Sequence, residues 1–221
     1  MTDSPQSTEP IASPALALPN EVWLAIFRRK ELSYFDLKRL SRVCKRFHGF
    51  EQSKSLDDLL FRSPPPNKPV KRGSPVRFHP TLNMTNLVCT DLELAIAIWR
   101  WEEEDKNKDA SFRAALSREY ATSPSTTVLE IAVADGVYID KKKGITVLDV
   151  VEACVTMWSS QPDHETAREI LEIHLSWRPK AKLEDINWFH WLYEHNGYTG
   201  LRSAEVISDG CVGLRMDSFD S

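Results

Sequence analysis

The stretch LPNEVWLAIFRRKELSYFDLKRLSRVCKRF, residues 18–47, decides how the first part of the chain folds. Pro19 suits the first turn of a helix, where the N–H that proline lacks would have no partner. The apolar residues after it recur at spacings of three and four, which predicts a helix with one apolar face. They are Val22, Trp23, Ile26 and Phe27. Ser33 with Asp36 three positions later is the pattern of a helix N-cap and its capping partner.

A second apolar stripe follows at helical spacing, and the two stripes together favour an interface. The second stripe comprises Leu37, Leu40, Val43, Cys44 and Phe47. A segment of about 30 residues is too short to enclose a self-sufficient core. So many large apolar residues on a small helical unit are typical of one half of an interface. Eight basic residues lie between the apolar positions and leave one side apolar: Arg28, Arg29, Lys30, Lys38, Arg39, Arg42, Lys45 and Arg46.

The order of short motifs in this stretch resembles the F-box, the helical motif that docks on the Skp-type adaptor of cullin–RING ubiquitin ligases. The motifs that carry the resemblance are Leu18-Pro19, Glu21-Val22, Leu24, Ile26-Phe27, Leu32, Asp36-Leu37, Leu40, and Val43-Cys44 with Phe47. The resemblance implies a Skp-type adaptor, and through it a cullin, as partners. It also implies eight adaptor-binding residues: Leu18, Pro19, Val22, Ile26, Phe27, Leu37, Leu40 and Val43.

Two other interpretations of residues 18–47 remain open at this point. Apolar residues at helical spacing are usually core, so the helices could pack only on their own chain. Eight basic residues also allow a DNA-binding helix-turn-helix. The whole chain has a formal net charge of −4, however, and no base-reading helix stands out. We therefore expect no nucleic-acid partner.

Composition predicts a soluble globular protein of one or two domains. The chain has 221 residues, 42% hydrophobic and 27% charged, which is an ordinary balance. We find no apolar stretch long enough to span a membrane and no secretory signal at residues 1–14, so we expect no membrane partner and a cytoplasmic or nuclear location. Four cysteines lie far apart without a CxxC pair, which predicts free thiols, no zinc site and no cofactor.

The distribution of prolines suggests how the chain divides. Residues 1–15 are rich in Ser, Thr and Pro and predict a disordered tail. We place the F-box at 16–61, with a further helix within 48–61. Five prolines and one glycine between Ser63 and Pro75 predict a semi-rigid linker over 62–75. The second domain would then occupy 76–221 and bind a substrate or another partner.

Residues 76–221 show strands and helices without a regular βαβ cycle, which favours an α+β domain. The pattern predicts strands at 76–78, 92–99, 127–133, 137–139 and 212–216, a loop at 102–109, helices at 110–120, 163–177 and 183–195, and a turn at 197–200. The strongest helix signal begins at Thr146, where Asp149 is the capping partner of an apolar face. Asp135-Gly136 is a hairpin turn signal between two strands.

Three short motifs of this region resemble an uncharacterised C-terminal domain found behind F-boxes in fungal proteins. They are His79-Pro80, Glu119-Tyr120-Ala121-Thr122 with Pro124, and Gly144-Ile145-Thr146-Val147-Leu148-Asp149. The resemblance implies a fungal lineage and a shared fold, but no chemistry.

The sequence gives no sign of a catalytic or metal site. His190 and His195 are five positions apart, so a helix does not bring them to one face as it does in an HExxH motif. GxSxG, P-loop and dinucleotide-binding patterns are absent, and we predict a protein that is not an enzyme. We expect an F-box subunit of an SCF-type ligase that serves ubiquitin-dependent proteolysis by recruiting an unknown protein substrate through residues 76–221. The alternative is a structural or regulatory protein that binds the adaptor without presenting a substrate.

Trp191 is the candidate for substrate contact. It falls on the polar side of the predicted helix 183–195, and an aromatic residue in such a place is a candidate binding hot spot. The competing interpretation buries Trp191 under the closing strand or the 197–200 turn, because large aromatic residues are usually mostly buried.

Overall fold

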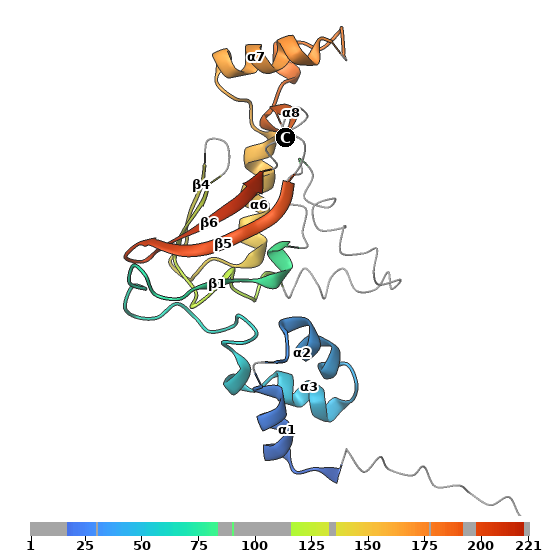
Figure 1. Cartoon of the computed structure of the whole chain (residues 1–221), viewed down its shortest axis with the longest axis vertical. Coiled ribbons are helices and arrows are strands. Elements are labelled where there is room, and N and C mark those ends of the chain that lie inside the picture. Colours follow the sequence, from blue (N-terminus) through green and yellow to red (C-terminus); the bar gives the residue numbers. More distant parts are fainter. Residues whose placement is uncertain are drawn as a thin grey trace, which may run out of the picture. The chain divides into compact units, whose positions relative to one another are not determined.

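The computed structural model describes residues 17–29, 31–83, 90, 116–132, 136–176, 178–191 and 198–218. The chain divides into two compact units, Met1–Leu56 and Asp57–Ser221, whose elements are labelled in Figure 1. Four of the sequence expectations lie wholly or mostly outside the described residues: the tail at 1–15, the strand at 92–99, the loop at 102–109 and the helix at 110–120.

The first unit consists of three short helices: α1 (Asn20–Phe27), α2 (Tyr34–Ser41) and α3 (Lys45–Glu51), followed by a 3-10 turn, η2 (Lys54–Leu56). The capping box predicted at Ser33 is confirmed, because the Asp36 N–H donates to Ser33 Oγ (3.1 Å) and the Ser33 N–H to Asp36 Oδ2 (3.0 Å). The second apolar stripe is not one continuous helix, however, because the chain turns between α2 and α3 and Cys44 is extended. The expected helix within 48–61 is likewise reduced to the end of α3 and η2.

Three aromatic rings form the centre of the first unit. Phe27 lies at the end of α1, and its ring centroid is 5.5 Å from that of Phe47 and 5.7 Å from that of Phe50, both on α3. The Trp23 ring lies 4.5 Å from the Phe47 ring. The turn between α2 and α3 is what allows α3 to fold back and bring these rings together.

The second unit contains a four-stranded sheet of order β4-β3-β6-β5. Its strands are β3 (Val128–Ala132), β4 (Val137–Asp140), β5 (Tyr198–Ser208) and β6 (Cys211–Ser218). The hairpins β3–β4 and β5–β6 are antiparallel, whereas β3 and β6 pair in parallel. The other elements are β1 (Arg77–Phe78), β2 (Thr122–Ser123), η3 (Pro80–Asn83), α6 (Val147–Ser159), α7 (His164–His174), η6 (Leu183–Asp185) and α8 (Trp188–Trp191). The expectation of an α+β fold is confirmed.

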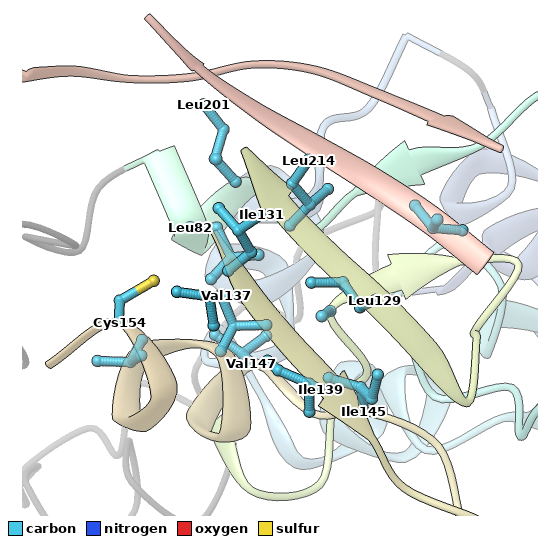
Figure 2. Packing of buried hydrophobic residues seen from close by; sticks show 14 of the residues in the cluster. Leu82, Leu129, Ile131, Val137, Ile139, Ile145, Val147, Cys154, Leu201 and Leu214 are labelled. Carbon is cyan, nitrogen blue, oxygen red and sulfur yellow. The ribbon is translucent and has the colours of Figure 1, made fainter. Parts of the chain in front are cut away.

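Helix α6 covers one face of this sheet (Figure 1). Its apolar side contributes Val147, Val150, Val151, Cys154 and Trp158 to the main core. Strand residues such as Leu129, Ile131 and Leu214 meet them from the sheet (Figure 2). The helix begins where predicted, since Thr146 and Asp149 form a capping box. Among the described residues, no helix is both long and apolar enough to cross a membrane.

Two expectations near the end of the chain are wrong. The predicted helix 183–195 is broken, because Ile186 takes an extended conformation between η6 and the four-residue α8. Ile186 thereby enters a small separate core with Ala167 and Ile170 of α7. The turn expected at 197–200 is also wrong, because residues 198–200 begin β5, an eleven-residue strand that the sequence did not predict. The closing strand at 212–216 is confirmed within β6.

The Pro-rich stretch 62–75 lies within the second unit. Ser125 Oγ donates to Ser63 O (2.7 Å), and the Gly210 N–H donates to Val70 O (2.8 Å). The Val70 side chain also packs against the main core. The division between the compact units therefore falls after Leu56, well before the predicted linker. The domain limits of 16–61, 62–75 and 76–221 remain a prediction.

Two fragments test those limits. A fragment that begins at Asp57 should be more stable than one that begins at Val76, because the shorter one loses the packing of Val70 and the Phe61 carbonyl that accepts from the Tyr120 N–H. We expect the free energy of unfolding in urea to differ by about 3 kcal/mol. If the two fragments were equally stable, the result would support a domain boundary near residue 76 instead.

The cap of α6 makes a pH-dependent contribution to stability. Burial would by itself raise the pKa of Asp149, but hydrogen bonds from Lys141 and Thr146, together with the Lys141 charge, lower it below the usual value of 3.8. A carboxyl with a lowered folded-state pKa stabilises the protein above its unfolded-state pKa, and this stabilisation is lost as the pH falls through the folded-state value.

Asp149→Asn should therefore lower the free energy of unfolding by about 1 kcal/mol at neutral pH. The difference from the wild type should shrink as the pH falls below 3.8. Asp140→Asn, at an exposed position on β4, is the control and should show no such difference. Urea unfolding at a series of pH values measures both, and a difference independent of pH would contradict the role of the Asp149 charge.

Candidate functional site

The candidate site of the first unit begins with the residues that lead into α1. The Arg46 guanidinium on α3 donates to the Leu18 carbonyl and, through Nε and Nη2, to Asn20 Oδ1 at 2.9 and 2.7 Å. The same guanidinium lies over the Phe50 ring, 5.6 Å from its centroid. Arg46 thus fixes the position of residues 18–20 relative to α3.

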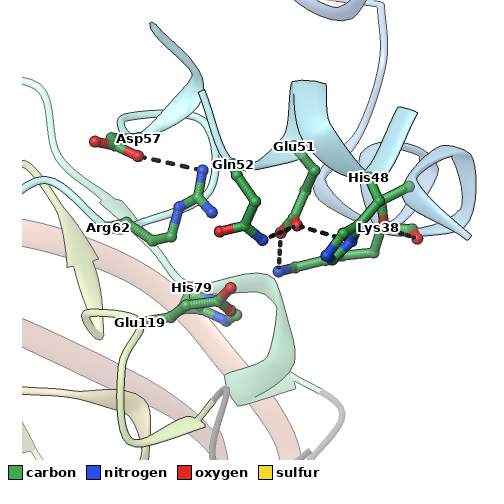
Figure 3. A network of polar contacts seen from close by, with 9 residues as sticks. Lys38, His48, Glu51, Gln52, Asp57, Arg62, His79 and Glu119 are labelled. Atoms are coloured by element: carbon green, nitrogen blue, oxygen red, sulfur yellow. Dashed lines mark hydrogen bonds and ion pairs between the residues drawn. The ribbon is translucent and has the colours of Figure 1, made fainter. Parts of the chain in front are cut away.

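A second polar group connects α2 to α3. Lys38 Nζ lies 2.9 Å from Glu51 Oε1, and Gln52 Nε2 donates to Glu51 Oε2 at 2.7 Å (Figure 3). His48 Nδ1 is 3.9 Å from the same carboxylate. Glu51 is buried, so these partners are what allow its carboxylate to remain inside the unit.

The sequence pattern could not have revealed Arg46 and Glu51 as positioning residues. Arg46 belongs to the run of basic residues that we interpreted only as the polar surroundings of an apolar side. Its contact with Asn20 joins positions 26 residues apart, and such a pairing has no periodic signal.

The eight residues predicted to bind the adaptor fall into two groups in the structure. Pro19 is exposed, and Leu18, Val22 and Val43 are 38%, 42% and 65% exposed. Ile26 and Leu40 are half-buried. We call these six residues the apolar surface.

Phe27 and Leu37 form the second group. Their side chains are 0% and 1% exposed, and Phe27 packs on the aromatic rings of α3. They lie inside the unit and help to hold the apolar surface in place. Val22 and Ile26, four positions apart on α1, lie on one face of that helix.

The three motifs of the second resemblance lie together inside the second unit. His79 Nε2 is 3.1 Å from Glu119 Oε2, and both side chains are buried (Figure 3). His79 Nδ1 accepts the Thr81 N–H at 3.1 Å, which places the ring proton of a neutral imidazole on Nε2, facing the carboxylate. The Ala121 N–H donates to Ile145 O, and the Val147 N–H to Glu119 O, so the third motif joins the other two.

This buried pair serves structure rather than chemistry. Both His79 nitrogens face groups of the chain itself, and both side chains are closed off from solvent. Two of the thiols are poor nucleophiles: burial raises the pKa of Cys154 to about 12, and burial and the Glu130 charge raise that of Cys211. Within the described ranges, no cluster of three or more His, Cys, Asp or Glu residues could hold a metal ion.

Trp191 is half-buried in the structure. It packs against both the main core and the small core of α7, and its ring centroid is 6.5 Å from that of Trp188. These packing contacts are enough to explain why an aromatic side chain occupies position 191. The contribution of Trp191 to substrate binding stays a prediction.

The division of the eight residues leads to a test. Phe27→Ala or Leu37→Ala should destabilise the first unit by about 3 kcal/mol, because each leaves a cavity in its core. Val22→Ala and Val43→Ala, at exposed positions, should change stability by less than about 0.5 kcal/mol. Amide hydrogen exchange within α1, α2 and α3 reports this unit alone. Equal losses of protection in all four variants would show that the exposed residues also belong to the core.

The comparisons with known proteins concern the first unit. The family model described as F-box-like matches residues 15–60, which include α1, α2 and α3. No curated protein and no solved structure matches the chain. The match covers the helices, the apolar surface and the capping box described above, and residues 15–60 are therefore an F-box-like domain.

Proposed function

We propose that this protein is an F-box subunit of an SCF-type ubiquitin ligase, which binds a Skp-type adaptor through the apolar surface and recruits a protein substrate through its second unit. F-box domains bind Skp-type adaptors, and F-box proteins are typically non-catalytic adaptors. The chain would contribute proximity between a ligase and its target, and the chemistry would belong to the ligase.

The observation that carries the proposal is the exposure of large aliphatic side chains within the matched domain. Val43 is the most exposed of them, in the turn between α2 and α3, and Val22 is exposed on α1. Removing such side chains from water on binding a partner yields about 25 cal/mol per Å² of apolar area. The aromatic rings at the centre of the unit, in contrast, are already buried and gain nothing from a partner.

Preorganisation also supports the proposal. Arg46 holds residues 18–20 against α3, and the Lys38–Glu51 pair holds α2 against α3. An adaptor would therefore meet helices whose arrangement is already set, and little conformational entropy would be lost on association.

Binding to a purified Skp-type adaptor tests the proposal. Val22→Ala and Val43→Ala should each weaken binding about thirtyfold, the effect of truncating an interface anchor worth about 2 kcal/mol. Tyr138→Ala and Ile173→Ala are matched controls, because these residues are also large, apolar and exposed but belong to the second unit. Isothermal titration calorimetry would measure the dissociation constants, with hydrogen exchange of the first unit as the check on folding.

Two results would count against the proposal. Wild-type affinity in a folded Val22→Ala, Val43→Ala double variant would remove the apolar surface from the interface. An equal loss in the Tyr138→Ala control would place the contact in the second unit. Substrate recruitment needs a separate experiment, in which protein levels are compared between cells with and without this protein. A recruited substrate should accumulate in the cells that lack it. If the protein only binds the adaptor and presents no substrate, no protein should accumulate.

A further inference from the structure

A cavity of about 670 Å³ lies at the end of α7 in the second unit. Residues at the end of α7, in the segment after it, and around α8 line it. Figure 1 shows α8 at the end of α6 and α7 beyond it, away from the sheet. The volume is within the range of small-ligand sites, roughly 300–1,000 Å³.

Basic side chains outnumber acidic ones in the lining of this cavity. Its cationic or potentially cationic side chains are His174, Arg178, Lys180 and His190, against the single carboxylate of Asp185. Asp185 is already engaged, because its Oδ2 accepts the Lys182 N–H at 3.0 Å. Within the part of the chain that the structure describes, the side chains of Arg178 and Lys180 have no hydrogen bond or ion pair.

The two histidine rings of the lining pack edge to face. His174 is 8% exposed, in the last turn of α7, and its ring centroid is 4.7 Å from that of His190 at an angle of 83°. His190 Nδ1 accepts the Asn187 N–H at 3.1 Å, so a neutral His190 ring carries its proton on Nε2.

Burial and nearby positive charge both act on His190. Burial, followed by the positive potential of His174 and Arg178, lowers the pKa of His190. The Asp185 carboxylate acts in the opposite direction without reversing the shift. An anion in the cavity would interact favourably with every one of these basic groups.

The rest of the lining is apolar. Pro179, Ala181 and Ile186 complete the cavity, and Ile186 belongs to the small core with α7. A ligand with one strongly anionic end and an organic body matches such a lining better than a bare ion does, because apolar walls cannot replace the hydration of a charge.

We propose that this cavity binds a phosphomonoester. A phosphoryl group carries a charge of about −1.5 to −2 at pH 7 and three acceptor oxygens. Arg178 can bind two of these oxygens through its planar fork, Lys180 supplies a point charge, and His190 a further donor. Pro179 and Ile186 take the organic body. All of these residues belong to the second unit, so the inference does not depend on adaptor binding.

The phosphomonoester could be a phosphorylated side chain of another protein or a small phosphorylated metabolite. NMR titration of the full chain, with the histidine rings labelled, separates these sources. The probes are inorganic phosphate, glycerol 3-phosphate, and a capped peptide with one phosphoserine together with its unphosphorylated form. The ring signals of His174 and His190 report occupancy directly, and the signals of His48 and His164, which do not line the cavity, serve as internal controls.

The variant Arg178→Gln, Lys180→Gln removes two exposed cationic side chains from the cavity and should weaken phosphomonoester binding at least tenfold. The matched control is Lys142→Gln, Lys143→Gln, which removes the same charge from exposed positions before α6 and should leave the dissociation constant unchanged. Saturation by the phosphopeptide but not by its unphosphorylated form would identify a protein ligand. Saturation by glycerol 3-phosphate alone would identify a metabolite.

The proposal is overturned by any of three results. The His174 and His190 signals could show no saturable shift with any phosphorylated probe. The unphosphorylated peptide could bind as tightly as the phosphopeptide. The two double variants could weaken binding equally, which would reduce the effect to the overall charge of the unit.

Discussion

The second unit depends on one short buried segment, residues 119–121, whose backbone groups must all find partners away from water. The Tyr120 N–H donates to Phe61 O, the Ala121 N–H to Ile145 O, and the Val147 N–H to Glu119 O. The carbonyl of Ala121 in turn accepts the His79 N–H. Three distant parts of the chain are thereby held on one segment. The buried Glu119 side chain lies beside His79, so a polar side chain and its partner are enclosed at the same place.

The first unit meets a different constraint, because three helices of seven or eight residues cannot enclose every large apolar side chain that they carry. The aromatic rings of Phe27, Phe47 and Phe50 fill the centre. The aliphatic residues Val22 and Val43 stay in contact with water. Size alone does not decide the division, because Leu37 is enclosed with the rings whereas Trp23 is only half-buried. An apolar surface therefore remains on a unit that is already held by Arg46 and by the Lys38–Glu51 pair.

Sequence reasoning succeeded where the determinants are local and failed where they are not. The capping boxes at Ser33 and Thr146 and the hairpin β3–β4 rest on residues a few positions apart, and each is present. Strand β5 was missed because much of its length lacks clean alternation, and its pairing with β6 carries register shifts. The helix expected at 183–195 was wrong because packing of Ile186 in the small core overrides its helical periodicity. At the candidate site, the pattern indicated which residues are apolar but not which of them lie inside, so Phe27 and Val22 were grouped together.

The same distinction explains why the two units differ in how readily their function can be inferred. The F-box-like domain consists of short helices formed by consecutive residues, so the order of its motifs is visible without any structure. The cavity at the end of α7 corresponds to no such local sequence pattern. His174 ends a helix, Arg178 and Lys180 lie in the segment after it, and His190 belongs to α8, so each side chain in isolation is an ordinary surface or core residue. These side chains come together only because the break at Ile186 turns α8 back toward α7. The break that made the helix prediction wrong is therefore also the feature that creates the basic cavity.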